Sequence, residues 1–310
     1  MAEPTINFCV CVPARNEAER LPVLLDALAA QDWPGPVMVA IGINNTTDGS
    51  LSVIADAQRH HGDHLDIKTV IADFPPELAH AGSARKLAMD AGLARVAMAA
   101  NGVLVSTDAD SRPPPDWLRN MAVALNRGAD LVGGRIVIDG QEPLPRPVHA
   151  LRLAWDTYWT AVRAIEDEID PLPWDLAPRH GDHTGASLAI RASVYQSCGG
   201  VPLLATGEDR ALVTAALARG ARLAHPANVY IAVSPRLDGR AEGGMASAMR
   251  QLYNVAEEGG RPMAPAFNHW RERALWRRRL RGRADGHALI ARREPLLPPM
   301  PHDMALEIEA

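Results

Sequence analysis

The sequence contains few cysteines, no long apolar run and no large excess of one charge. Three cysteines in 310 residues are too few for a disulfide-stapled secreted domain, and no signal peptide is recognisable, so we expect a reducing, cytoplasmic location. No run of about 18 apolar residues is present, which argues against a transmembrane helix. The formal net charge of -5 supplies no basic field for nucleic acid, so we expect no nucleic-acid partner.

What the sequence does contain is a regular alternation of two patterns over its first 140 residues. Short β-branched runs, such as NFCVCVPA and VMVAIGIN, are separated by stretches with apolar residues at helical spacing. Runs that are apolar at nearly every position are typical of strands buried on both faces of a sheet. The alternation predicts an α/β fold, Rossmann-like, with a mostly parallel central sheet and helices on both faces. We expect strands at 7–14, 37–44, 65–72, 102–108 and 129–139, and helices at about 17–31, 50–60, 82–99 and 116–127.

The alternation stops between residues 141 and 180. Proline-rich turns there flank one long helical stretch, HALRLAWDTYWTAVRAIEDEI. Its residues Trp155, Tyr158 and Trp159 have the spacing of one helix face, which fits the core better than a platform for sugar. Regular elements are expected again further on: a strand and turn at 185–195, a helix at 208–220 and a strand at 221–233.

The C-terminal part differs in charge and composition. The segment RERALWRRRLRGR (271–283) carries seven arginines and one glutamate. Such a segment suits a solvated helix face, and also a peripheral contact with an anionic membrane or a protein. The proline-rich stretch at 293–303 is expected to be a loose end. We divide the chain into a main domain at 1–245, with halves at about 1–140 and 141–245, and a C-terminal helical extension at 246–310. The sequence does not indicate an oligomeric state.

Carboxylates follow the fourth predicted strand. If the strand order is the common 3-2-1-4, then PARNEAE after the first strand and TDADSR after the fourth lie at one crevice. Asp108 and Asp110 would there suit Mg²⁺ or Mn²⁺, which take hard oxygen ligands and complete their shells with water and phosphate. Alternatively, Asp110 caps the next helix and Asp108 is a turn residue. Glu208 and Asp209 form a second acidic pair at a helix start, where the helix dipole also favours them.

Taken in order, these motifs resemble those of the family 2 glycosyltransferases, which have the GT-A fold. The resemblance spans about residues 7–244. It implies a metal-dependent enzyme, with Mn²⁺ or Mg²⁺, that moves a sugar from a nucleotide-diphosphate sugar, expected to be a UDP-sugar, to an acceptor hydroxyl. The matching stretches are VCVPARNEAERLPVLLDAL, INNTTDGS, HAGSARKLAMDAGL, VLVSTDADSRPPPDWL, TGASLAIRASVYQSCGGV, ATGEDRALVTAALARGARL and SPRLDGRAEGG.

The resemblance also implies roles for individual residues. Asp209, with Glu208 as the alternative, matches the general base of a single displacement with inversion, although retention stays open. The implied metal ligands are Asp108 and Asp110 of the D-x-D motif, with His225 as a candidate late ligand. The implied acceptor residues are His183, Thr184 and Gly185. The implied donor-binding residues are Pro13, Arg15, Glu17, Asn45, Asp73, Arg85, Lys86, Asp108, Ala109, Arg236 and Arg240.

Other interpretations of these residues remain open at this point. Asn44 and Asn45 stand where the family often has acids, and Lys86 stands where it usually has asparagine. The two basic residues at 85 and 86 also fit a solvated helix face, the two histidines fit loop or strand-end positions, and the last two arginines fit a glycine-flanked connector. A nucleotidyltransferase would usually carry a glycine-rich loop after strand one, and PARNEAER contains no glycine. A non-catalytic module that binds nucleotide sugars is the third alternative.

Overall fold

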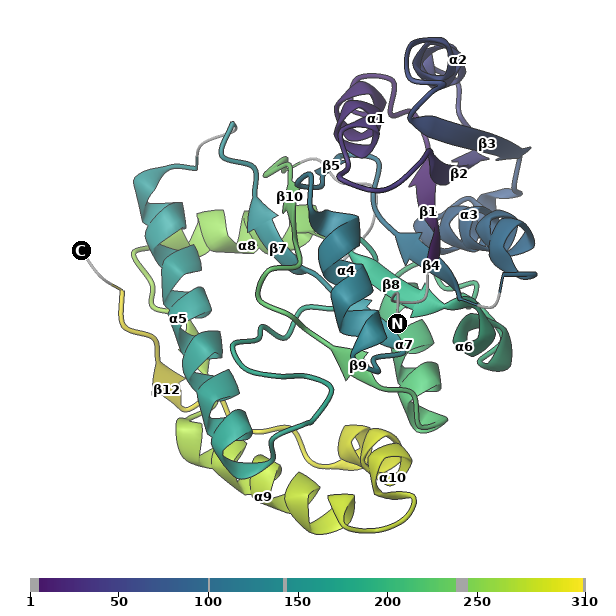
Figure 1. The fold of residues 1–310 in the computed structure, drawn as a ribbon. Coiled ribbons are helices and arrows are strands. Elements are labelled where there is room, and N and C mark those ends of the chain that lie inside the picture. Colours follow the sequence, from purple (N-terminus) through teal and green to yellow (C-terminus); the bar gives the residue numbers. More distant parts are fainter. Residues whose placement is uncertain (1–5, 100, 142–143, 238–244, 309–310) are drawn as a thin grey trace.

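A computed structural model describes residues 6–99, 101–141, 144–237 and 245–308, and it has a seven-stranded sheet at its centre (Figure 1). Its order is β3-β2-β1-β4-β8-β6-β9, and the first four strands run parallel, so the predicted order 3-2-1-4 is confirmed. The strands are β1 (Asn7–Ala14), β2 (Val37–Asn44), β3 (Leu65–Ala72), β4 (Gly102–Ser106), β6 (Leu131–Gly133), β8 (Leu188–Arg191) and β9 (Leu223–Ala224).

Two of the predicted strands are each divided between two sheets. The run at 129–139 forms β6 and then β7 (Arg135–Ile138), and the run at 221–233 forms β9 and then β10 (Tyr230–Val233). β7 and β10 belong to a three-stranded sheet with β5 (Ser111–Arg112). The break after β6 lies at Gly134, where an added Cβ would lie 2.0 Å from Oγ of Ser187. The segment of Ser187 packs against Gly134 and interrupts the strand there. The apolar pattern of residues 129–139 does not reveal this break.

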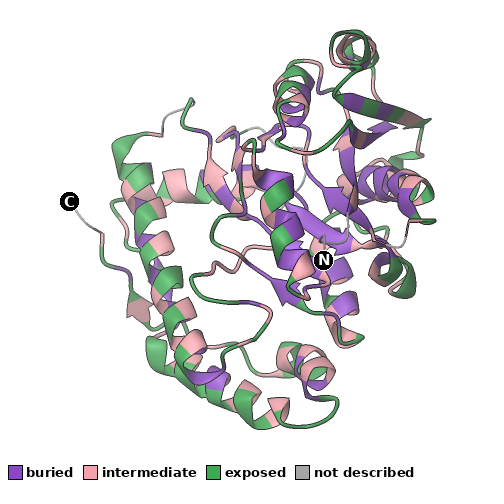
Figure 2. Ribbon diagram, viewed as in Figure 1, coloured by how far each residue is buried: buried purple, intermediate pink, exposed green. Residues whose placement is uncertain are grey.

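Helices cover both faces of the central sheet, as the continuous apolar strands predict. Along β1, Val10 and Val12 lie in one buried cluster with α1 and α4, while Cys9 and Cys11 lie in the other with α3, α6 and α7. Figure 2 shows the buried sheet between these layers. The stretch at 192–195, expected to be a turn, begins a helix. The helices of this part are α1 (Leu21–Ala29), α2 (Ser50–His60), η1 (Pro76–Leu78), α3 (Ala81–Val96), α4 (Trp117–Asn126), α6 (Ala192–Ser197) and α7 (Glu208–Ala218).

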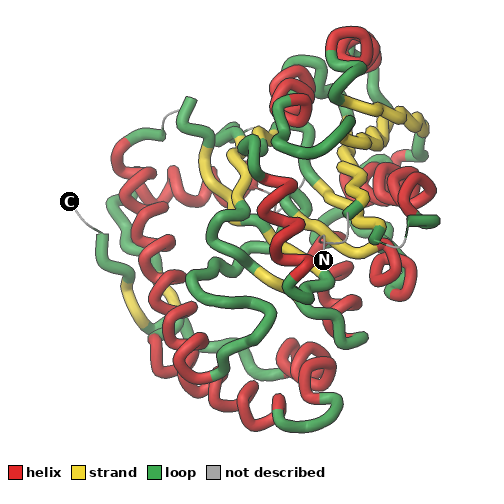
Figure 3. The backbone as a smooth tube through the Cα atoms, in the orientation of Figure 1, coloured by secondary structure: helices red, strands yellow, loops and turns green. Residues whose placement is uncertain are grey.

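The remaining helices lie together beside the sheet (Figure 3). α5 (Arg146–Ile169) packs along α9 (Phe267–Arg281). The C-terminal stretch that was expected to be loose is held in place: β12 (Met304–Ala305) pairs with β11 (Met263–Ala264), and Leu306 is buried. The other elements are α8 (Met245–Glu257), α10 (Gly286–Arg293) and η2 (Glu294–Leu296).

Part of the arginine-rich segment pairs with residues at the end of α5. Glu166 of α5 is 3% exposed and pairs with Arg277 of α9 at 2.5 Å. Arg281 pairs with Asp170 at 2.6 Å, and Arg278 donates to the carbonyl of Ile169. The helix is therefore solvated on one side, while its other side is neutralised by Glu166 and Asp170, and a peripheral contact of the exposed arginines stays a prediction. No helix among the described residues is long and apolar enough to cross a membrane.

We predict that Tyr158→Phe lowers the free energy of unfolding by about 1–2 kcal/mol. The Tyr158 hydroxyl is buried, donates to the Pro265 carbonyl at 2.8 Å and accepts from Nε1 of Trp270 at 2.6 Å. Both partners lose their bond in the variant. Urea denaturation measures the change, and Tyr230→Phe, at a tyrosine that is 39% exposed, is the matched control with an expected change below about 0.5 kcal/mol. Equal effects of the two variants would contradict the prediction.

Candidate functional site

The ends of β1 and β4 lie side by side, as the sequence predicts. Cys11 is in register with Ser106, and the amide of Thr107 donates to the carbonyl of Cys11. The residues after these strands therefore emerge at one edge of the sheet. This brings PARNE and TDAD to the same crevice.

Arg85 joins the two acidic motifs beneath this crevice. Its Nε donates to Oε1 of Glu208 at 2.9 Å, and its Nη2 donates to Oδ1 of Asp108 at 2.9 Å. Its Nη1 donates to Oγ of Ser106 at 2.6 Å and to the carbonyl of Gly185 at 2.9 Å. The guanidinium is buried, and the two carboxylates hold its pKa above the usual value against the effect of burial, which alone would lower it.

Two glycines allow Arg85 to reach this position. An added Cβ at Gly82, in the first turn of α3, would lie 2.1 Å from the carbonyl oxygen of Leu204 in the loop before α7. An added Cβ at Gly185 would lie 2.4 Å from Cζ of Arg85 itself. The start of α3 can therefore approach the start of α7, and the guanidinium fits against the backbone at Gly185.

Arg85 and Lys86 differ in position, although the sequence suggests the same role for both. Arg85 lies beneath the ends of the strands, and all three nitrogens of its guanidinium donate hydrogen bonds to protein atoms. Lys86 pairs with Asp90 at 2.9 Å on the surface of α3. Neither of these contacts points to a phosphate ligand, and their role as donor-binding residues stays a prediction.

Asp110 lies in an acidic setting with one arginine. Its carboxylate pairs with Arg236 at 2.9 Å, and Arg236 also lies 3.5 Å from Oε2 of Glu17. Burial raises the pKa of Asp110 to about 6, with Asp108 and Glu17 adding to the rise and Arg236 opposing it. Such a carboxylate gains more than an exposed one from a cation at this position, because the cation favours its charged form.

Glu208 and Asp209 are neighbours with different surroundings. Glu208 is 5% exposed and is held by Arg85. Asp209 is half-buried, and its Oδ2 accepts a hydrogen bond of 2.6 Å from the amide of Gly185. Its Oδ1 accepts from the amide of Arg210. Asp209 is thus positioned by two backbone amides, whereas Glu208 is neutralised by a buried cation.

His183 and His225 form a chain with Asp175. Nδ1 of His225 lies 2.9 Å from Oδ2 of Asp175, and Nε2 of His225 lies 3.2 Å from Nδ1 of His183. Burial, with His225 adding to it, lowers the pKa of His183 to about 4, so this ring is neutral. Because the Asp175 carboxylate only accepts hydrogen bonds, we assign Nδ1 of His225 as the donor to it, and in the contact between the two rings one nitrogen donates and the other accepts. A metal ion at His225 would have to break one of these bonds, so its role as a late ligand stays a prediction.

The remaining predicted donor and acceptor residues differ in burial and in their hydrogen bonds. Arg15 donates to the carbonyl of Ala79. Asn45 has a φ of 45° and exchanges two hydrogen bonds with the backbone of Phe74, next to the exposed Asp73. Pro13 is half-buried at the end of β1, Ala109 is buried, and Thr184 is exposed. Arg240 lies outside the described residues.

Two contributors to this site were missed in the sequence. Ser106 supports Arg85 and bonds the carbonyl of Gly185 at 2.7 Å, and its signal was a polar residue at the end of a buried strand. Asp175 holds His225 from a proline-rich loop, 50 residues away in the chain. No local pattern reveals that second contact.

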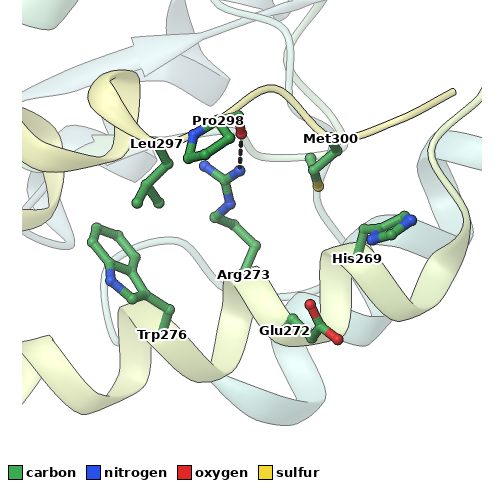
Figure 4. A pocket seen from close by; sticks show the side chains of 7 residues that line it. All are labelled: His269, Glu272, Arg273, Trp276, Leu297, Pro298 and Met300. Carbon is green, nitrogen blue, oxygen red and sulfur yellow. Dashed lines mark hydrogen bonds between the residues drawn. The ribbon is translucent and has the colours of Figure 1, made fainter.

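A separate cavity of about 190 Å³ lies between α9 and the C-terminal stretch, as Figure 4 shows. Arg273 crosses it and donates to the carbonyl of Pro298. α9 lies on the other side of the molecule from β3 and β2 (Figure 1). None of the motif residues lines this cavity. Its walls are His269, Glu272, Arg273, Trp276, Leu297, Pro298 and Met300.

The profile of Glycosyl transferase family 2 matches residues 9–185, which is more than half of the chain. The chain belongs to this family. Its members transfer sugars, and the matched segment includes the crevice, Arg85 and both aspartates of the D-x-D motif. No curated protein matches the chain by sequence.

Solved structures of other proteins show a similar fold. S. aureus TarS (residues 1–349) in complex with UDP-GlcNAc aligns with a TM-score of 0.53 and 16% identity, over 89% of this chain and 72% of that one. The mannosyltransferase PcManGT from Pyrobaculum calidifontis, in complex with GDP-Man and Mn²⁺, aligns with a TM-score of 0.50 and 20% identity, over 94% of this chain and 80% of that one. At these identities the similarity concerns the fold, which is the predicted GT-A fold.

Proposed function

We propose that this glycosyltransferase moves a sugar from a UDP-sugar to an acceptor hydroxyl by a single displacement with inversion. The observation that carries the proposal is that the carboxylates of the site lie on two different elements. Asp108 and Asp110 follow β4, while Asp209 lies at the start of α7, tied to them through Gly185 and Arg85. A donor and an acceptor can therefore be served by separate carboxylates in one crevice.

Asp209 is the proposed base because its carboxylate is partly accessible and is held by neutral backbone donors. Oδ1 and Oδ2 each accept one hydrogen bond from a backbone amide, so each keeps a lone pair for the acceptor hydroxyl. A carboxylate in this position takes the proton of the acceptor hydroxyl as that oxygen attacks the anomeric carbon, and the nucleotide leaves on the opposite face. Glu208 is a poor alternative as the base, since its carboxylate forms a buried ion pair with Arg85.

Asp108 and Asp110 are the residues that would hold a divalent cation. Their oxygens are hard ligands, and Mg²⁺ or Mn²⁺ often takes only one or two carboxylates beside substrate phosphates. No larger group of potential ligands is gathered among the residues that the structure describes, which agrees with a site that the donor completes. When bound, the ion would neutralise charge on the diphosphate. PcManGT was crystallised with Mn²⁺, which supports such a site here.

The test is the release of nucleotide from a panel of UDP- and GDP-sugars, with Mn²⁺, with Mg²⁺ and with EDTA. We expect release from a UDP-sugar with a metal ion and at least about a hundredfold less with EDTA. Asp110→Ala should weaken Mn²⁺ binding, and Asp116→Ala, a nearby carboxylate that starts α4, is the control. Absence of release with every donor, together with absence of metal-dependent nucleotide binding, would refute the proposal.

A further inference from the structure

Arg236 reaches the predicted cation site from the segment that follows β10. β10 pairs with β5 antiparallel, with Val233 opposite Ser111. The chain that continues beyond Val233 therefore runs alongside the residues that precede Ser111. The segment after β10 therefore lies close to Asp110, and the Arg236 side chain reaches its carboxylate from there.

The Arg236 guanidinium contacts the carboxylate of Asp110 at the position where a metal ion would bind. Its Nη2 lies 2.9 Å from Oδ2 of Asp110, and its Nη1 lies 3.5 Å from Oε2 of Glu17. Asp110 is largely buried, with 15% of its side chain exposed, while Arg236 is 30% exposed. The acid is thus fixed in the crevice, and the arginine is the partner with access to solvent and with freedom to move.

Two arginines pair with the carboxylates around the predicted cation site. Among the described residues, Arg85 pairs with Asp108 and Glu208, and Arg236 pairs with Asp110 and Glu17. Arg85 is buried and bound on four sides, so it cannot leave without exposing its partners. Arg236 has a close ion pair with Asp110 and a longer one with Glu17, so it is the arginine that a metal ion can displace.

We propose that Arg236 competes with the divalent ion for Asp110. Its guanidinium pairs with Asp110 in the metal-free protein and moves to the donor diphosphate when the ion binds. This inference rests on the proposed cation site. It adds an order to binding: the guanidinium becomes available to the anionic donor only once the ion has taken Asp110. Arg236 is then a positioning residue in both states, first for the carboxylate and then for the phosphates.

The experiment measures the affinity of the donor-free protein for Mn²⁺ alone, by electron paramagnetic resonance of free Mn²⁺. We expect Arg236→Gln to bind Mn²⁺ about tenfold more tightly than the wild type, since no guanidinium has to be displaced. Arg112→Gln is the matched control. It removes the same charge two residues from Asp110, but Arg112 pairs with Asp139 and Gln141. Its Mn²⁺ affinity should change less than about twofold. Arg236→Lys, which keeps the charge, should stay near the wild type.

A second measurement follows Arg236 after the exchange. In saturating Mn²⁺, Arg236→Gln should bind UDP about tenfold more weakly than the wild type, because the diphosphate loses a guanidinium. Unchanged or weaker Mn²⁺ binding by Arg236→Gln, or equal gains in both glutamine variants, overturns the competition. Metal-independent UDP binding that Arg236→Gln abolishes also overturns it, since Arg236 would then replace the ion. None of these readouts requires sugar transfer, so a failed transfer assay is distinguishable from a failure here.

Discussion

Asp209→Asn is expected to reduce nucleotide release from the active donor by about 10²–10⁴-fold, the usual contribution of a general base. The dissociation constant for UDP with Mn²⁺ should stay within about twofold of the wild type. Asparagine has the same shape as aspartate, and its amide oxygen can still accept the bond from the Gly185 amide. The variant removes the basic oxygen without touching Asp108 or Asp110. Single-turnover release and UDP titration measure the two effects separately.

The neighbouring carboxylate is the control for this prediction. Glu208→Gln removes a charge that neutralises buried Arg85, so it should lower stability, as seen in the urea midpoint. If Glu208→Gln kept its stability and lost release, while Asp209→Asn released nucleotide normally, the two roles would be reversed. Equal loss of UDP binding in Asp209→Asn and Asp110→Ala would refute the separation of base and metal site.

Arg85→Met is expected to lower the free energy of unfolding by about 3–5 kcal/mol, because it leaves a buried carboxylate without its partner. Arg85 is 8% exposed at the side chain and Glu208 is 7% exposed, while Asp108, at 38%, is partly screened by water and contributes less. Release should fall as well, since Asp108 and Gly185 both lose the group that positions them. Urea denaturation and nucleotide release measure the two losses.

Two further variants separate the charge of Arg85 from its position. Lys86→Met removes the adjacent charge on α3, where the pair with Asp90 is exposed, and should cost less than about 1 kcal/mol. The double variant Arg85→Met with Glu208→Leu removes both buried charges and should regain much of the stability without regaining release. A loss in Arg85→Met no larger than that in Lys86→Met would contradict the burial that we describe.

Local patterns were sufficient for most of the parallel half of the fold. The apolar strands at 7–14, 37–44 and 65–72 are confirmed to the residue. The first two runs are almost completely buried, and the edge strand at 65–72 alternates between buried and exposed residues. The runs at 129–139 and 221–233 were predicted as single strands because their apolar pattern continues across the breaks. The break in the first run lies at Gly134, where the segment of Ser187 comes too close for a Cβ.

The tail illustrates the same limit. Seven arginines in 271–283 indicate a solvated or membrane-facing helix when they are viewed alone. Glu166 and Asp170 on α5, more than 100 residues earlier, neutralise Arg277 and Arg281, and the strand pair β11–β12 holds the end of the chain. Ion pairs between distant helices leave no periodic signal in the sequence.

By itself the sequence determined the family and the alternation of strands and helices, because strand periodicity and motif order are local properties. The meeting of the two polar strand ends followed only on the assumption of the common strand order 3-2-1-4, which the structure has. Only the tertiary structure decided what each charged residue does at that edge. It buried Arg85 between Asp108 and Glu208, left Asp209 on backbone amides, and brought Arg236 to Asp110. The physical reason is that a charged side chain takes its partner from the segment packed against it, and packing joins residues separated by 100 positions or more.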